Sequence, residues 1–146
     1  MVQNSTTYYV WIGGSCDYGH KERAGGAAVV IEHGGSIISH DVISDLHTTE
    51  FRMILTLMVK VMYELPDGSD LLFLTNAAYI QNFDKTPTAK SANPDLIAQC
   101  IKAKMQHNSV GVKIVQYHKS PLLIETHDMA TEAMAKTRKE YYHDIK

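Results

Sequence analysis

The chain has 146 residues, enough for one domain with a full-sized core and little room for a second. It is 45% hydrophobic and 21% charged, and it contains no apolar run near the length of a membrane span, which excludes a membrane-spanning or low-complexity protein. The formal net charge is −2 and the isoelectric point about 6.4, so the chain lacks the basic excess that usually drives binding to phosphate backbones.

The two cysteines and the N-terminal residues carry no sign of an oxidising compartment. Cys16 and Cys100 are far apart and form no C-x-x-C motif, so neither a disulfide framework nor a cysteine zinc site is indicated. The first residues, M-V-Q-N-S-T-T, lack the basic and apolar regions of a secretory signal. We therefore expect a cytoplasmic protein.

Three strands are predicted at the start of the chain. Residues 8–12 are aromatic and β-branched, and two glycines follow them. Residues 24–31 form a second apolar run. The turn Glu32-His33-Gly34-Gly35 leads into a third strand near 36–44. This spacing predicts an antiparallel meander.

A buried helix is predicted next. Thr48-Thr49-Glu50 combines hydroxyl caps with an acid in the first turn. Residues 51–65 are apolar around most of the helix, and Pro66-Asp67-Gly68 ends it. A helix of this kind, too short to cross a membrane, is expected in the middle of a domain.

The second half of the chain alternates between strands and helices. We expect a central strand at 71–74, a small helix through Tyr79 and Ile80, a loop at 84–92 and a helix from Asn93 to about His107. A strand at 112–117 and a final helix at 126–142 follow. The order βββ-α-β-α-α-β-α indicates an α/β domain with a mixed five-stranded sheet and helices on both faces.

Several local stretches resemble ribonuclease H of type 1, in the order and spacing of that family. They are G-G-S-C at 13–16, A-G-G-A-A-V-V at 24–30, T-T-E-F-R-M-I-L at 48–55, T-N-A-A-Y-I at 75–80, N-P-D-L at 93–96 and H-D-M-A at 127–130. The resemblance covers about residues 8–142 and implies a single ribonuclease H-like domain over 1–146. In active members of that family, four carboxylates bind two magnesium ions that cleave the RNA strand of an RNA/DNA hybrid.

The resemblance places the four carboxylate positions on residues that keep only part of this chemistry. The first aspartate falls on Gly13, interpreted here as a strand glycine at a bulge, and the third falls on Asn76, a neutral and poorer magnesium ligand. The second falls on Glu50, or on Ile54 in an alternative register, and the fourth on Asp128. Glu50 and Asp128 also fit a purely structural role as acids near helix starts.

A histidine completes the resemblance. His118 lies ten residues before Asp128, where the family often carries a mobile histidine that assists product release. The chain has eight histidines, so this match is also expected by chance.

The residues lead to three functional hypotheses. The first is a domain that has lost hybrid cleavage, binds any metal only weakly through Glu50 and Asp128, and serves to bind a protein or an RNA/DNA hybrid. The missing basic excess favours a protein, and Lys85 and Lys90 are a weak substitute for the basic protrusion of some relatives.

The other two hypotheses are enzymatic or metal-binding. One is an active Mg²⁺- or Mn²⁺-dependent nuclease whose site is rebuilt from Asp17, Asp41 or Asp45, although ordinary positions in loops and turns explain these acids better. The other is a histidine–carboxylate metal site made by His118, His127 and Asp128, which no familiar ligand spacing supports.

Overall fold

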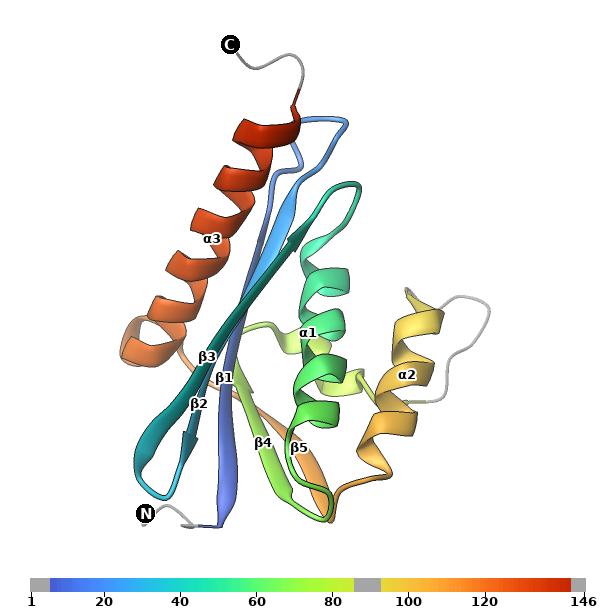
Figure 1. Cartoon of the computed structure of the whole chain (residues 1–146), viewed down its shortest axis with the longest axis vertical. Helices are drawn as coiled ribbons and strands as arrows, with labels where there is room; N and C mark the ends of the chain where they lie inside the picture. Colours follow the sequence, from blue (N-terminus) through green and yellow to red (C-terminus); the bar gives the residue numbers. More distant parts are fainter. Residues whose placement is uncertain (1–5, 86–92, 143–146) are drawn as a thin grey trace.

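The protein forms one five-stranded sheet with long helices on both of its faces (Figure 1). The computed structural model describes residues 6–85 and 93–142. The strand order is β3-β2-β1-β4-β5, with β1 in the centre. This is the mixed sheet and the element order that the sequence predicted.

The strands follow the register expected for a meander joined to two parallel strands. Their bounds are β1 Thr7–Cys16, β2 Gly25–His33, β3 Ser36–Asp45, β4 Asp70–Thr75 and β5 Ser109–Ile114. β1 pairs antiparallel with β2 and β2 antiparallel with β3, whereas β1–β4 and β4–β5 are parallel. The central strand therefore has an antiparallel and a parallel neighbour.

The helices divide between the two faces of the sheet. Their bounds are α1 Glu50–Glu64, α2 Pro94–Lys104 and α3 Pro121–Tyr141, with short 3₁₀ turns η1 at Ala78–Asn82 and η2 at Tyr117–Lys119. α1 packs on one face with α2 beside it, and α3 lies along the opposite face over β1, β2 and β3 (Figure 1). No helix of the described residues is long and apolar enough to cross a membrane.

α1 is the centre of the main hydrophobic core, as its sequence predicted. Thr49 is its N-cap, and the Thr49 hydroxyl oxygen accepts a hydrogen bond from the Arg52 backbone N–H at 3.1 Å. Eight side chains of the helix are buried: Met53, Ile54, Leu55, Leu57, Met58, Val59, Val61 and Met62. They pack on the sheet on one side and on α2 on the other, so almost the whole circumference of α1 is covered.

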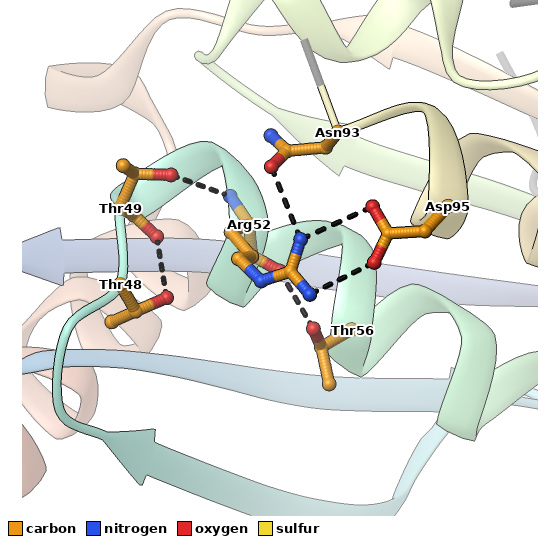
Figure 2. Close-up of polar contacts among 6 residues, drawn as sticks. All are labelled: Thr48, Thr49, Arg52, Thr56, Asn93 and Asp95. Atoms are coloured by element: carbon orange, nitrogen blue, oxygen red, sulfur yellow. Dashed lines mark hydrogen bonds and ion pairs between the residues drawn. The ribbon is translucent and has the colours of Figure 1, made fainter.

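A two-pronged ion pair joins α1 to the start of α2 (Figure 2). Arg52 donates from both terminal nitrogens to the carboxylate of Asp95, at 3.2 and 2.9 Å. The same guanidinium also donates to the Asn93 side-chain oxygen at 3.3 Å. Asn93 has a φ of 53°, a left-handed conformation that asparagine adopts more readily than most residues. The hydrogen bond from Arg52 holds the Asn93 side chain at this turn into α2.

Several predicted boundaries were wrong, for reasons that lie in the partners of each element. β1 continues through Gly13 to Cys16 because β2 pairs with it along the whole stretch. β5 lies at 109–114 and not at 112–117, because β4, the strand with which it pairs, ends at Thr75 opposite Ile114. α2 ends at Lys104, before the expected His107, and residues 86–92 of the expected loop lie outside the described residues.

Two further expectations need correction. The last helix begins at Pro121 and not near residue 126, because proline is favourable at the first helical position. Gly13 lies in a regular ladder opposite Ala28, not at a bulge. The bulge of this sheet is in β3, where the register with β2 shifts between Ile31 and Glu32.

Candidate functional site

The middle of β1 lies where three elements converge. Trp11 pairs with Leu74 in the parallel register, so Asn76, just after the end of β4, lies beside Gly13. Successive strand residues face opposite sides, so Gly13 faces α3 and Gly14 faces α1. The positions that the sequence analysis singled out on β1, β4 and α1 are therefore neighbours in space.

α3 fills the space in front of Gly13. A Cβ atom at this position would lie 2.7 Å from the Thr126 hydroxyl oxygen and 3.0 Å from the His127 ring. Thr126 is fully buried, and its hydroxyl donates to the Leu123 carbonyl at 2.7 Å, which fixes it in place. The direction in which a side chain at position 13 would project is thus occupied by the second turn of α3.

His127 bridges the two strands at this point. Its Nε2 atom lies 3.0 Å from the side-chain oxygen of Asn76, and its ring also makes a hydrogen bond with the Gly14 backbone. Partial burial lowers the pKa of His127 from its ordinary value, against the opposing effects of the carboxylate of Glu50, the Gly14 contact and Asp128. A neutral imidazole is therefore favoured in this position.

Glu50 lies on the other side of β1, in the first turn of α1. Its Cγ would lie 3.0 Å from a Cβ atom on Gly14, and Ile54, one helical turn further, approaches the same point at 3.0 Å. The two residues that the sequence left as alternatives thus share one stripe of α1. Ile54 is 1% exposed and part of the core, whereas Glu50 retains access to solvent.

Two tyrosines hold Glu50. The Tyr79 hydroxyl donates a hydrogen bond to the Glu50 carboxylate at 2.6 Å. The Glu50 backbone N–H donates to the Tyr18 hydroxyl at 3.0 Å. Burial raises the pKa of Tyr79, and the hydrogen bond to Glu50 raises it further, so the phenol keeps its proton. This contact could not be predicted from the sequence, because nothing in the spacing of residues 18, 50 and 79 shows that they meet.

Asp128 and His118 are exposed, and both lie close to the residues described above. Asp128 follows His127 on α3 and is exposed to solvent. His118 lies in η2, and its ring packs edge-on against Tyr117, which in turn packs edge-on against His127. The ring centroids of Tyr117 and His127 are 5.0 Å apart.

The loop and turn acids considered as replacement ligands have other partners. Asp17 binds His20 and Arg138 at 2.7 and 3.2 Å, and Asp41 forms an ion pair with Lys60 of α1. Asp45 accepts a hydrogen bond from the Leu46 backbone N–H at 2.8 Å.

The donor set around Gly13 does not fit a pair of magnesium ions. Within the described residues, no group of three or more histidine, cysteine, aspartate or glutamate side chains is close enough to hold a metal ion. Magnesium prefers carboxylates and water in octahedral geometry, and here the nearest ring nitrogen and side-chain amide are bonded to each other.

Comparison with known proteins supports the fold. LC9-RNase H1, described as a type 1 RNase H with the type 2 active-site motif, superposes with a TM-score of 0.75 at 19% identity over 93% of this chain and 75% of that one. RNase H1 from Halobacterium salinarum gives a TM-score of 0.68 at 12% identity, over 89% of this chain and 98% of that one. No protein-family model matches the sequence, and no curated protein matches it significantly.

A third similar structure contains a nucleic acid. LC11-RNase H1, solved in complex with an RNA/DNA hybrid, has a TM-score of 0.71 at 13% identity, with 89% of this chain and 98% of that chain covered. At such low identities the likeness shows the fold alone, and this chain is a protein of the ribonuclease H-like fold.

Proposed function

We propose that this chain is a ribonuclease H-like domain that does not cleave RNA/DNA hybrids and serves to bind a partner. The observation that carries the proposal is the packing of α3 against Gly13. The His127 ring and the Thr126 hydroxyl occupy the space into which a side chain at position 13 would project. The position is therefore closed by a helix, and a single return to aspartate would not reopen it.

The charge of the remaining residues supports the same conclusion. If Gly13 and Asn76 stand at two of the four carboxylate positions, the site lacks two negative charges that would face two doubly charged ions. Each lost contact between unit charges at 4 Å is worth about 4 kcal/mol at an effective dielectric of about 20. Glu50, held by Tyr79, and Asp128 would then hold one ion weakly at most.

A protein is the favoured partner. The net charge of −2 gives no general attraction to a phosphate backbone. The residues around Gly13 contribute an imidazole, an amide, tyrosines and the acids Glu50 and Asp128, a mixture that is common in protein interfaces and whose negative charges repel a phosphate backbone.

The test is cleavage of a labelled RNA/DNA hybrid in magnesium and in manganese, with the variants Glu50→Gln and Asp128→Asn assayed beside the parent. We expect the parent to show no chelator-sensitive cleavage of the hybrid, even at high protein concentration and in manganese. Parent cleavage that both variants lose would overturn the proposal and show that the metal site has been rebuilt.

A further inference from the structure

The loop between β1 and β2 is organised around one carboxylate. The side chain of Asp17 is 12% exposed and accepts a hydrogen bond from the Gly19 backbone N–H at 3.0 Å. It also lies 2.7 Å from Nδ1 of His20 and 3.2 Å from Nε of Arg138. Gly19 and His20 belong to the loop, whereas Arg138 belongs to the end of α3, beside which the loop lies (Figure 1). One side chain therefore both shapes the loop and ties it to the helix.

The opposite side of the same loop contacts the start of α1. The Tyr18 hydroxyl accepts a hydrogen bond from the Glu50 backbone N–H at 3.0 Å, and it also interacts with the Cys16 thiol. Glu50 is the first residue of α1, so its N–H has no partner within the helix. Tyr18 thus satisfies this N–H and lies against Cys16, although Tyr18 itself is 63% exposed.

Residues 18–21 have few buried contacts. Three of these four residues are exposed and none is buried. The base of the loop is fixed by backbone hydrogen bonds, from the Asp17 N–H to the Ala24 carbonyl at 2.8 Å and from the Thr48 N–H to the Arg23 carbonyl at 3.2 Å. A segment with exposed side chains on a fixed base can open at a low cost in free energy while the rest of the fold stays intact.

Two features next to this segment are unfavourable in its observed position. Arg23 has a φ of 45°, a left-handed conformation that costs free energy for a residue other than glycine. Glu22 is 9% exposed, and its Oε1 atom has no hydrogen-bond partner among the described residues. A buried carboxylate oxygen without a partner also costs free energy. Both costs are relieved when the loop loosens, so they favour a second position of the loop.

We propose that residues 18–21 form a latch, closed in this structure, and that the contact between Asp17 and Arg138 keeps it closed. When Arg138 is drawn away from Asp17, the latch opens and Tyr18 leaves the start of α1. A change at the end of α3 is thereby transmitted to the first turn of α1, which carries Glu50.

The two cysteines report two different kinds of opening. Both thiols are free, and Cys100 is fully buried in the main core, so Cys100 reacts only when the domain unfolds. Burial raises the pKa of the Cys16 thiol, and an open latch exposes this thiol and increases its thiolate fraction. The rate of alkylation at Cys16 therefore measures opening of the latch wherever it exceeds the rate at Cys100.

The first measurement is alkylation of the full chain by iodoacetamide, followed at each cysteine by mass spectrometry. Arg138→Gln should raise the rate at Cys16 at least about five-fold, because a charge-assisted hydrogen bond that favours the closed position is lost. The rate at Cys100 should stay at least about ten-fold below the rate at Cys16. Lys139→Gln is the matched control, because it removes the same charge from the next residue of α3, which is exposed. It should leave the rate at Cys16 within about two-fold of the parent.

Exchange of the Glu50 amide proton, measured by NMR, tests the far end of the coupling. Arg138→Gln should accelerate this exchange at least about five-fold, since Tyr18 protects the amide only in the closed position. Tyr18→Phe removes the protecting hydroxyl without changing Arg138. If the two residues act through one latch, the double variant should exchange no more than about two-fold faster than Tyr18→Phe alone.

Three outcomes would overturn the proposal. The first is an equal rate at Cys16 in the parent and in Arg138→Gln, and the second is a rise that Lys139→Gln reproduces. The third is alkylation of Cys16 and Cys100 at the same rate in Arg138→Gln, which would assign the rise to unfolding of the whole domain. Opening of the latch is independent of the proposed function, because neither a hybrid nor a partner enters these measurements.

Discussion

Gly13 and Gly26 lie on the face of the sheet that α3 covers, and they allow the helix to approach closely. A Cβ atom at position 26 would lie 2.5 Å from the Ala130 carbonyl oxygen, and one at position 13 would lie 2.7 Å from the Thr126 hydroxyl. These distances are shorter than any ordinary contact of a Cβ atom. The absence of a side chain at position 13 is therefore explained by packing, whatever the position did in an ancestor.

This explanation predicts the effect of alanine at three glycines. Gly13→Ala should lower the free energy of unfolding by about 1–3 kcal/mol, and Gly26→Ala by at least as much because its obstacle is helix backbone. Gly111→Ala is the control, because its Cβ would meet only the Leu72 side chain at 3.5 Å, and it should change stability by less than about 1 kcal/mol. The measurement is urea unfolding of the parent and the three variants. If Gly13→Ala is as harmless as Gly111→Ala, α3 does not press on β1.

The sequence predicted the neighbourhood of the site but not its contacts. Glu50, Asn76 and Gly13 come together because the order of motifs follows the order of elements in the fold. Each step along a helix rotates the side chain by about 100°. The packing of α3 on the sheet sets the rotation of the helix, so that His127 faces Gly13 while Asp128 is exposed, and the sequence does not contain that information.

At the scale of elements, the loop between β1 and β2 is tied to the end of α3. Asp17 accepts from the Gly19 backbone at 3.0 Å and binds both His20 and Arg138, while the Tyr142 hydroxyl accepts from the Ala24 backbone N–H at 2.6 Å. Desolvation acts to raise the pKa of Asp17, but the His20, Gly19 and Arg138 contacts together lower it below its ordinary value. The carboxylate form of Asp17 is therefore the one that joins the loop to the helix.

Asp17→Asn tests this connection through pH. A carboxyl group with a lowered pKa in the folded state stabilises the fold above its unfolded pKa, near 3.8, and loses that effect as the pH falls through the folded value. We expect the variant to be less stable than the parent by about 1–2 kcal/mol at pH 7. The difference should shrink as the pH is lowered from about 4 toward 2.5. Urea unfolding across this range measures it, and a difference independent of pH would contradict the role of the charge.

The elements that the sequence predicted best are those whose signal is local. α1 has its threonine cap, its apolar circumference and the terminating Pro66 within its own residues, and its bounds were found to within one residue. β5 and the extension of β1 depend on the length of a partner strand far away in the chain, which periodicity does not contain. Most of the boundary errors therefore fall on elements whose ends are set by residues far away in the chain.

At the scale of the whole molecule, different helices cover the two faces of the sheet. α1 and α2 enclose the main core on one face, with Arg52 and Asp95 joining them at the surface (Figure 2). On the opposite face α3 closes the space at Gly13 with its first turns and packs against β3 along its later turns.

The overall charge predicts weak binding to a nucleic acid. With a net charge of −2, we expect a dissociation constant for a 20-base-pair RNA/DNA hybrid weaker than about 10 μM near physiological salt. Each phosphate contact contributes about −0.9 to the slope of log K against log salt, so the slope should be no steeper than about −2. Fluorescence anisotropy with a labelled hybrid at several salt concentrations measures both quantities.

Binding of the hybrid by the double variant Glu50→Gln/Asp128→Asn is compared with binding by the parent, because the variant changes the net charge from −2 to 0 by removing two acids near Gly13. If the hybrid approaches this part of the surface, the variant should bind it more tightly than the parent, since two repulsive charges are gone. A parent that already binds below about 1 μM with a slope steeper than about −4 would contradict the prediction. It would mean that a local basic surface outweighs the net charge, and a nucleic acid would then replace a protein as the favoured partner.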